Sequence, residues 1–335
     1  MELENKKILI TGGAGFVGSH LCERLLKEGS EVVILDNFST GNLSNLDKIK
    51  DKIKIIEGDI KNYEDVLRSI EGCEIVIHEA FPYGKSGMGL EQQYIEEGIL
   101  GTFNLLKASV KKGIKKFVNI SSVSAYGIQE KTPLKEEDKI NAFLPYGVTK
   151  YSGELYCKSF SKIYGLETIS LRYLFGYGPR YAQFDHNAIV NFMNNVVKNK
   201  PLIIYGDGLQ TRDYSYIDDL VEGTILAAKK DKSSGEVYNI SSGEGINILD
   251  LAKKIIEISG KNLEIKFAEP GEYKFGDEFC KIPIGATTKE NEKWVDKRNY
   301  VGDISKAKSE LGYNPKIDLE EGIKKTLEWL EKQNE

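Results

Sequence analysis

Short apolar runs alternate with longer amphipathic segments in the first half of the chain. The apolar runs predict five β-strands, over 7–11, 31–36, 53–57, 74–78 and 116–120. Each run is continuously apolar rather than alternating, which is typical of parallel strands covered on both faces. A helix is predicted over 19–27, between the first two strands. Strands that alternate with helices form right-handed βαβ units, so we expect an α/β fold with a doubly wound parallel sheet of the Rossmann type.

The pattern becomes looser after residue 172. Residues 176–185 are rich in Gly, Tyr and Pro and predict a loop, as do the polar residues 273–295. The remaining segments predict a strand that rejoins the first sheet, over 236–240, and helices over 188–198, 217–230, 248–259 and 318–331. We therefore expect a larger domain over 1–176, to which 212–246 returns, interleaved with a smaller mixed α/β domain over 177–335.

Composition narrows the class of protein. The 335 residues are 40% hydrophobic and 29% charged, which fits a folded protein of two domains. No apolar run reaches the ~18 residues of a membrane span, and the charged first seven residues contain no apolar signal core. A net charge of −5 argues against nucleic acid as a partner. The four cysteines and three histidines are widely spaced, so we expect no disulfide framework, no metal site and a cytoplasmic location.

A glycine-rich turn follows the first predicted strand. Residues 11–18 read TGGAGFVG and place Gly12, Gly15 and Gly18 directly before a predicted helix. Glycines at this spacing let backbone N–H groups approach a pyrophosphate, and the helix N-terminus adds partial positive charge. Within a βαβ unit this context predicts a dinucleotide site. Asp36 ends the second strand, where a carboxylate accepts hydrogen bonds from ribose hydroxyls and repels a 2′-phosphate, which favours NAD over NADP.

Two further segments supply groups for proton transfer. Tyr146 and Lys150 are four residues apart and would lie on one face of a helix. A nearby ammonium stabilises a phenolate and so lowers the pKa of the phenol, which lets the tyrosine act as a general base. Ser122 follows the fifth strand, at the sheet edge where ligands bind in this fold, and its hydroxyl can relay a proton. By spacing alone, an exposed helical pair and a serine-rich loop remain open as alternatives.

Together these motifs resemble the extended short-chain dehydrogenase/reductase superfamily and, within it, the NAD-dependent epimerase/dehydratase family, in particular its UDP-glucose 4-epimerases. The resemblance covers nearly the whole chain. It rests on TGGAGFVG at 11–18, Asp36, Gly58-Asp59-Ile60, SSVSAYG at 121–127, YGVTK at 146–150, and the segments 171–173, 176–180 and 206–214. It implies that the larger domain binds NAD and that the smaller one binds a sugar nucleotide.

The resemblance also assigns roles to individual residues. Tyr146 would be the catalytic base, Lys150 would hold the nicotinamide ribose, and Ser122 would occupy the catalytic Ser/Thr position. The residues implied to bind the cofactor are Gly12, Gly15, Phe16, Val17, Gly18, Asp36, Asn37, Asp59, Ile60, Ala80, Tyr146, Lys150 and Tyr173. The residues implied to bind substrate are Ser124, Asn187, Arg212, Lys293 and Tyr300. Without the resemblance, Arg212 would fit an interdomain salt bridge and Asn187 a helix N-cap.

The residues after Ser122 favour one reaction among those of the family. A 4,6-dehydratase has Asp-Glu after its catalytic Thr, where this chain has Val123 and Ser124, and a decarboxylase has Glu at the second position. The resemblance therefore implies a nucleotide-sugar 4-epimerase that acts on a UDP-hexose through a 4-keto intermediate. The bulk of Tyr300 favours plain over N-acetylated hexoses. A dehydratase, a decarboxylase and a non-catalytic NAD-binding regulatory protein are the alternatives.

Three positions depart from the family pattern near the expected sugar and nicotinamide. Phe81 stands in place of a small residue, Gly98 in place of an Asn, and Phe175 in place of a substrate-binding Asn. The resemblance also implies a homodimer that associates through helices over 91–112 and 145–164. The side chains expected at that interface are Leu155, Tyr156, Phe160 and Tyr164.

Overall fold

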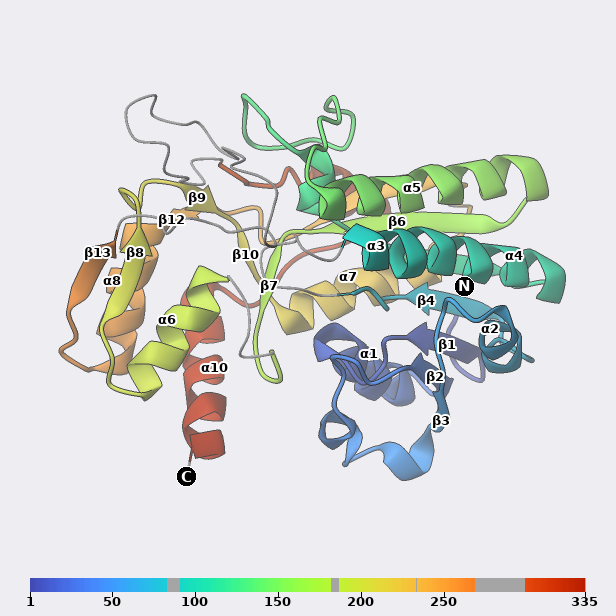
Figure 1. Ribbon diagram of the computed structural model, residues 1–335, viewed down its shortest axis with the longest axis horizontal. Helices are drawn as coiled ribbons and strands as arrows, with labels where there is room; N and C mark the ends of the chain where they lie inside the picture. Colours follow the sequence, from blue (N-terminus) through green and yellow to red (C-terminus); the bar gives the residue numbers. More distant parts are fainter. Residues whose placement is uncertain (83–90, 182–186, 233, 269–298, 335) are drawn as a thin grey trace.

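A seven-stranded parallel sheet forms the centre of the larger lobe in the computed structural model, which describes residues 1–82, 91–181, 187–232, 234–268 and 299–334 (Figure 1). Its strand order is β11-β6-β5-β4-β1-β2-β3. The strands are β1 (Lys7–Thr11), β2 (Glu31–Asp36), β3 (Lys54–Glu57), β4 (Ile75–His78), β5 (Lys116–Ser122), β6 (Glu167–Tyr173) and β11 (Glu236–Ile240). The order reverses beside β1, as expected for a doubly wound sheet, so the predicted fold class is confirmed.

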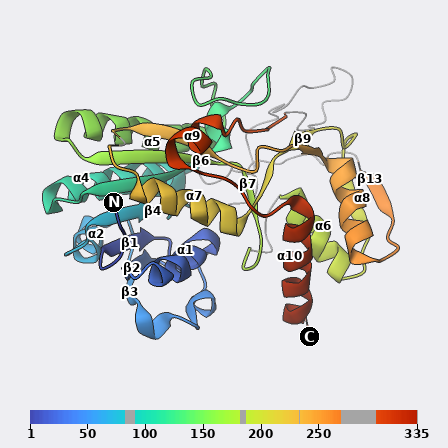
Figure 2. The ribbon, with the colours of Figure 1, turned by 180° about the vertical axis from the view of Figure 1, so that it is seen from behind.

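Helices cover both faces of the sheet, as the two opposite views show (Figures 1 and 2). One core contains Ile8 and Ile10 of β1 and lies beneath α1 (Phe16–Lys27) and α7 (Ile217–Lys229). The other contains Leu9 of the same strand, beneath α2 (Tyr63–Ser69), α4 (Thr102–Lys112) and α5 (Pro145–Tyr164). Successive side chains of a strand point to opposite faces. A strand buried on both faces therefore needs the continuous apolar run seen in the sequence.

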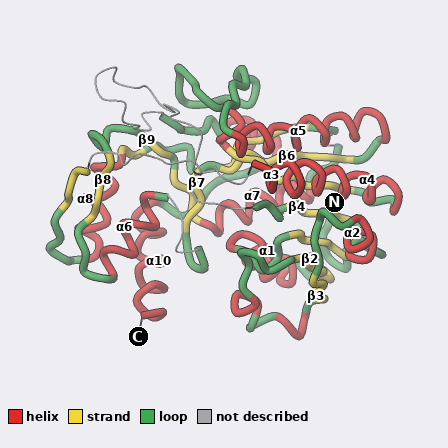
Figure 3. Tube along the Cα trace, viewed as in Figure 1, coloured by secondary structure: helices red, strands yellow, loops and turns green. Residues whose placement is uncertain are grey.

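The smaller lobe combines helices with short two-stranded sheets (Figure 3). Its helices are α6 (Ala188–Val197), α8 (Ile248–Ser259) and α10 (Leu319–Asn334). Its strands pair as β8 (Leu202–Tyr205) with β13 (Ile265–Ala268) and β9 (Thr211–Arg212) with β12 (Ile246–Asn247). A further pair, β7 (Phe175–Tyr177) with β10 (Tyr214–Tyr216), joins the lobes, and α9 (Ser305–Leu311) packs on β11.

The predicted elements agree closely with the observed ones. The strand over 236–240 pairs with β6 at the edge of the central sheet, which confirms its return from the second half of the chain. The helix over 91–112 has three parts: α3 (Glu91–Gln93), the π-helix η4 (Tyr94–Gly101) and α4. Short 3₁₀ turns are η1 (Leu43–Leu46), η2 (Lys50–Lys52) and η5 (Val123–Tyr126). None of the helices in the described ranges is long and apolar enough to cross a membrane.

Two expectations have no structural test. The loop over 273–295 lies outside the described residues. The domain boundary at 176 stays a prediction, although the two lobes visible in Figure 1 are connected near β7.

Candidate active site

The glycine-rich turn between β1 and α1 is closely packed. Gly12 has φ +72°, and a Cβ there would lie 2.9 Å from backbone atoms of Ala80. A Cβ on Gly18 would overlap the carbonyl oxygen of Gly12. Gly15 is the N-cap residue of α1, with Phe16 and Val17 at the start of the helix. A larger side chain would therefore open this turn, whose shape fits a pyrophosphate on the helix N-terminus.

Asp36 closes the turn from the end of β2. Its Oδ2 accepts a hydrogen bond from the backbone N–H of Ala14 at 2.9 Å, and its Oδ1 accepts one from Phe38 at 2.8 Å. Burial raises the pKa of this carboxyl, while the two N–H donors oppose the rise. Asp36 thus braces the glycine-rich turn, and its predicted bond to a ribose would use the remaining lone pairs.

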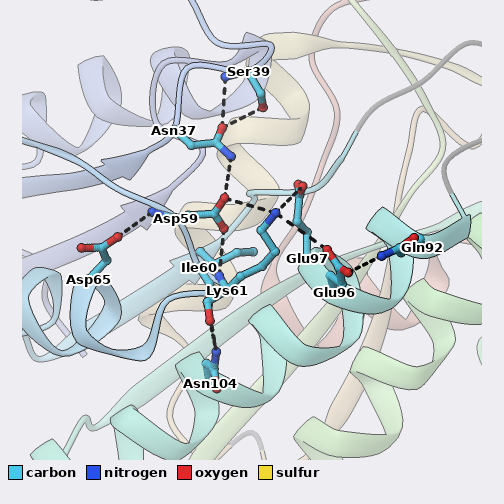
Figure 4. A network of polar contacts seen from close by, with 10 residues as sticks. All are labelled: Asn37, Ser39, Asp59, Ile60, Lys61, Asp65, Gln92, Glu96, Glu97 and Asn104. Carbon is cyan, nitrogen blue, oxygen red and sulfur yellow. Dashed lines mark hydrogen bonds and ion pairs between the residues drawn. The ribbon is translucent and has the colours of Figure 1, made fainter.

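A polar network forms the next part of the site (Figure 4). The Asn37 side chain donates to Asp59 Oδ2 at 3.2 Å, and Asp59 Oδ1 accepts from the backbone N–H of Lys61 at 2.9 Å. Lys61 Nζ lies 3.4 Å from Glu97 of the π-helix, and Asn104 of α4 donates to the carbonyl of Ile60 at 3.1 Å. Asn37, Asp59 and Ile60, three of the residues predicted to bind the cofactor, are thereby fixed between β2, β3 and the π-helix.

The candidate proton relay lies where β5 meets the start of α5. Ser122 ends β5, and its Oγ accepts a hydrogen bond from the N–H of Ser124 at 3.1 Å. Lys150 is buried, and its Nζ donates to the carbonyl of Ile120, two residues before Ser122, at 2.9 Å. The same Nζ lies 5.9 Å from the centroid of the Tyr146 ring. The fold therefore gathers residues 122, 146 and 150 around one strand end.

Glycine makes this approach of α5 possible. A Cβ on Gly147 would overlap the carbonyl oxygen of Ser124. The helix begins with Pro145 at its first position, which suits the fixed φ of proline and needs no N–H donor. The glycine of YGVTK is thus needed for packing against the turn that follows β5.

The segment after β4 brings a carboxyl group toward Lys150. Burial raises the pKa of Glu79 to about 7, and the nearby Lys150 lowers it. Burial lowers the pKa of Lys150 to about 8, and Glu79 raises it. Among the described residues, Glu79 Oε2 has no hydrogen-bond partner. Sequence reasoning missed this residue because its proximity to Lys150 depends on how β4 and α5 pack.

His78 links the cofactor turn to the π-helix through a chain of hydrogen bonds. Its Nδ1 lies 2.8 Å from Thr11 Oγ1, which accepts from the N–H of Ala80 at 3.1 Å. Its Nε2 lies 2.9 Å from Thr102 Oγ1, which donates to the carbonyl of Gly98 at 2.5 Å. Burial lowers the pKa of His78 to about 3, so the ring is neutral. A neutral ring that donates at Nε2 and accepts at Nδ1 satisfies every link.

Asn187, one of the residues predicted to bind substrate, stands at the start of α6 in the smaller lobe. Asn187 is the N-cap residue of α6 by position, but its side chain makes no capping bond and its Nδ2 donates to the carbonyl of Gly176 at 3.0 Å. Its Oδ1 is buried and has no partner within the described part of the chain. A buried acceptor of this kind calls for a donor, which favours a ligand role over the N-cap alternative.

Arg212 and Tyr300 lie together at the junction of the lobes. The Arg212 guanidinium carbon lies 5.3 Å from the ring centroid of Phe175 and 5.5 Å from that of Tyr300. The Tyr300 hydroxyl donates to the carbonyl of Gly127 at 2.9 Å, directly behind the turn that contains Ser124. The side chain of Asp213 fixes this corner by accepting from the N–H groups of Ser242, Gly243 and Gly302.

Two other predicted site residues are Tyr173 and Lys293. The Tyr173 hydroxyl is bonded to Thr224 of α7, so a cofactor contact would have to come from its ring or backbone. Lys293 lies outside the described residues. The roles of the site residues remain predictions.

Known proteins resemble this chain along its whole length. The sequence profile of the NAD dependent epimerase/dehydratase family matches residues 8–241. A putative UDP-glucose 4-epimerase of Methanocaldococcus jannaschii is 34% identical over 98% of this chain and 99% of its own length. UDP-glucose 4-epimerase of Thermotoga maritima, crystallised with UDP-glucose, superposes with a TM-score of 0.83 at 32% identity, covering 98% of this chain and 100% of that one.

A second solved structure has another sugar nucleotide in its site. UDP-glucuronic acid 4-epimerase from Bacillus cereus, in complex with UDP-glucuronic acid and NAD, also has a TM-score of 0.83 at 32% identity, covering 98% of this chain and 99% of that one. Profile, sequence and structure agree with the resemblance drawn from the motifs, which is confirmed. This chain belongs to the NAD-dependent epimerase/dehydratase family.

Proposed function

We propose that this protein is an NAD-dependent sugar-nucleotide 4-epimerase that acts on a UDP-hexose through a 4-keto intermediate. The observation that carries the proposal is the placement of Tyr146 and buried Lys150 at the end of β5. There Lys150 Nζ donates to the carbonyl of Ile120, two residues before Ser122 and four before Ser124. The glycine-rich turn that would hold the cofactor starts from β1 of the same sheet, and β1 and β5 both flank β4.

The residues of the relay suit proton transfer at a sugar hydroxyl. Bound NAD would accept a hydride from the sugar carbon and return it. Tyr146 would take the proton of the same hydroxyl, Lys150 would favour the phenolate electrostatically, and Ser122 would hydrogen-bond the oxygen and relay the proton. Because the keto sugar must present its other face before it is reduced, the pocket has to hold the nucleotide firmly and the hexose loosely.

The positions that follow Ser122 support epimerisation over elimination. Val123 is a buried apolar residue and Ser124 has a hydroxyl that is no acid or base near neutral pH. Neither can remove a carbon-bound proton or expel a hydroxyl, as the dehydratase alternative requires. A decarboxylase would need a carboxylate where Ser124 stands, by the family pattern.

The smaller lobe would bind the nucleotide. The Arg212 guanidinium can contact phosphate oxygens bidentately, and the buried Asn187 Oδ1 can accept from a hydroxyl or an N–H of the ligand. Lys293 would add a second cation. Tyr300 would form the wall behind the hexose, anchored by its bond to Gly127, and its bulk favours hexoses without an N-acetyl group.

A product assay tests the reaction. The purified protein is incubated separately with UDP-glucose, UDP-galactose, UDP-glucuronic acid and UDP-N-acetylglucosamine, and products are followed by NMR. We expect interconversion at carbon 4 with no net NADH, and loss of the activity in Tyr146→Phe. A 4-keto-6-deoxy product or released carbon dioxide would overturn the proposal in favour of a dehydratase or a decarboxylase. Full activity of Tyr146→Phe would overturn the assigned base.

The surface of α4 and α5 supports a homodimer. Large apolar side chains are exposed on these two helices and on the π-helix that precedes α4: Leu100 on η4, Val110 on α4, and Val148, Leu155, Tyr156, Ile163 and Tyr164 on α5. Exposed apolar side chains gathered on neighbouring helices favour an association site, and a two-fold axis beside them would pair each helix with its copy. The expectation for Phe160 was wrong, because its side chain is buried beneath the helix against Phe103. Light scattering should show a dimer for the parent protein and a shift toward monomer for Leu155→Lys.

The free cysteine thiols support a cytoplasmic location. Cys22, Cys73 and Cys157 are free and buried. Free thiols persist in a reducing compartment. Fractionation of cells that produce the protein would test this placement, and recovery with the secreted or membrane fraction would contradict it.

A further inference from the structure

A cluster of aromatic rings surrounds the candidate base. The ring of Phe81 contacts that of Tyr146 edge-on, with centroids 5.2 Å apart and planes at 86°. On another side Phe81 stacks on Tyr94 of the π-helix at 5.5 Å. Lys150 Nζ lies 4.0 Å from the Phe81 ring centroid, well within the range of a cation–π contact. One side chain therefore contacts both members of the proposed relay.

The ring fits because position 98 has no side chain. A Cβ on Gly98 would lie 2.8 Å from Cε2 and 3.2 Å from Cζ of Phe81, and it would also overlap the methyl group of Thr149. Phe81 and Gly98 both depart from the family pattern, which has a small residue at the first position and Asn at the second. In this structure the two departures are sterically linked, because the Phe81 ring occupies the space that a side chain at position 98 would fill.

The ring also compensates for the burial of a cation. Lys150 is buried, and its Nζ donates a hydrogen bond to the carbonyl of Ile120. The cation–π interaction stabilises a desolvated ammonium more than an exposed one, because water no longer competes for the charge. Burial disfavours the charged form of Lys150, and its pKa is lowered to about 8. The Phe81 ring opposes this effect, because its face stabilises the charged form of Lys150.

Other groups around Lys150 also influence its charge. From the segment after β4, the Glu79 carboxyl raises the pKa of Lys150, and Lys150 in turn lowers the pKa of His78, whose ring is neutral. From its own helix the Tyr146 ring lies 5.9 Å away. From β6, the Tyr173 hydroxyl interacts with Glu79. Of these, Glu79 can supply a compensating charge, so a test of Phe81 has to leave Glu79 unchanged.

We propose that Phe81 is a positioning residue of the proton relay: its ring holds the Lys150 ammonium over one face and the Tyr146 ring against its edge, in space provided by Gly98. The proposal rests on the proposed function, since it gives Lys150 and Tyr146 their roles. It predicts that Phe81 acts on the chemical step through the charge and placement of these two side chains rather than through substrate binding.

The test compares Phe81→Leu with the matched control Phe103→Leu. Leucine fills most of the volume without a π-face. Phe103 packs on Tyr156 and Phe160, so its loss removes a ring from the same helical layer at a distance from the relay. For Phe81→Leu we expect kcat to fall about tenfold with KM within about twofold. The alkaline limb of the kcat profile and the Lys150 pKa, followed by NMR of isotope-labelled lysine, should each move about one pH unit lower.

Steric coupling supplies a second measurement. Gly98→Ala alone should lower kcat sharply, because the added Cβ displaces the Phe81 ring. In Phe81→Ala/Gly98→Ala the loss should be smaller than the product of the two single losses, because the ring is gone. Strictly multiplicative losses would overturn the shared-space part of the proposal.

An unshifted Lys150 pKa and an unchanged pH profile in Phe81→Leu would overturn the positioning role, as would the same shift in Phe103→Leu. Failure of the proposed function is recognised separately. In that case the parent enzyme converts none of the sugar nucleotides, or Tyr146→Phe keeps full activity. If Tyr146→Phe is inactive and Phe81→Leu behaves like the parent, the proposal for Phe81 alone is refuted.

Discussion

The buried ion pair between Arg172 and Glu154 joins the strand β6 to α5, the helix that carries the proposed relay. The Arg172 side chain is 3% exposed and that of Glu154 4%. Arg172 Nε and Nη2 donate to the two carboxylate oxygens at 2.9 and 2.7 Å, and Ser121 Oγ donates to the same carboxylate at 2.5 Å. We predict that Glu154→Leu destabilises the protein strongly, because it leaves the guanidinium buried without its anion.

The magnitude follows from the burial of both partners. Removal of one member of a buried, hydrogen-bonded pair costs about 3–5 kcal/mol. Replacement of both partners by apolar residues leaves no buried charge, so Glu154→Leu/Arg172→Met should lose far less. It forfeits the contact of the guanidinium with the Tyr126 ring, 4.4 Å away, which is worth about 1–2 kcal/mol. The two substitutions should therefore couple by at least about 2 kcal/mol.

Thermal and urea unfolding of the parent, both single variants and the double variant measure this coupling. Glu154→Leu should lower the midpoint of thermal unfolding by about 4–7 °C, and the double variant by about half as much or less. If Glu154→Leu costs less than about 1 kcal/mol, or if the double variant loses the sum of the single losses, the pair does not behave as a desolvated unit and the reasoning fails.

Three further predictions concern the cofactor turn, the substrate lobe and pH. Gly18→Ala should weaken NAD binding at least about tenfold in calorimetry, because its Cβ would overlap the Gly12 carbonyl; equal affinity would contradict the packing argument. Asn187→Ala should raise KM about tenfold and leave kcat within a few fold, because the ligand loses the buried acceptor Oδ1. A fall in kcat alone would contradict a role of Asn187 in substrate binding. The pKa of Glu79 is raised to about 7, so the folded state binds this proton more tightly than the unfolded state does. The protonated carboxyl therefore contributes its full stabilisation below the ordinary pKa of Glu, and this contribution is lost as the pH rises toward 7. The free energy of unfolding, measured by urea titration, should therefore fall less for Glu79→Gln than for the parent between pH 5 and about 7.5. If it falls with pH equally in both proteins, the assignment is refuted.

Much of the larger lobe could be predicted from local patterns. Strands buried on both faces must be continuously apolar, so Ile8, Leu9 and Ile10 reveal β1 without any knowledge of its neighbours. The glycine spacing at 12, 15 and 18 depends on backbone sterics within one turn, and the structure shows the close contacts that make those glycines necessary. Residues 122, 146 and 150 were identified by motif, and their convergence follows from the parallel order of the sheet.

The sequence alone therefore determined the fold class, the family and the residues of the proposed relay, because these depend on short-range spacing and on a motif order shared along the whole chain. Only the tertiary structure decided what surrounds Lys150. Glu79, Phe81 and Gly98 lie 52 to 71 positions before Lys150 along the chain by their numbering, and no local pattern relates them to it. The packing of the π-helix against α5 brings them together, and burial then raises the pKa of Glu79 and lowers that of Lys150. The same packing explains why two departures from the family pattern occur together: Phe81 and Gly98 share one space.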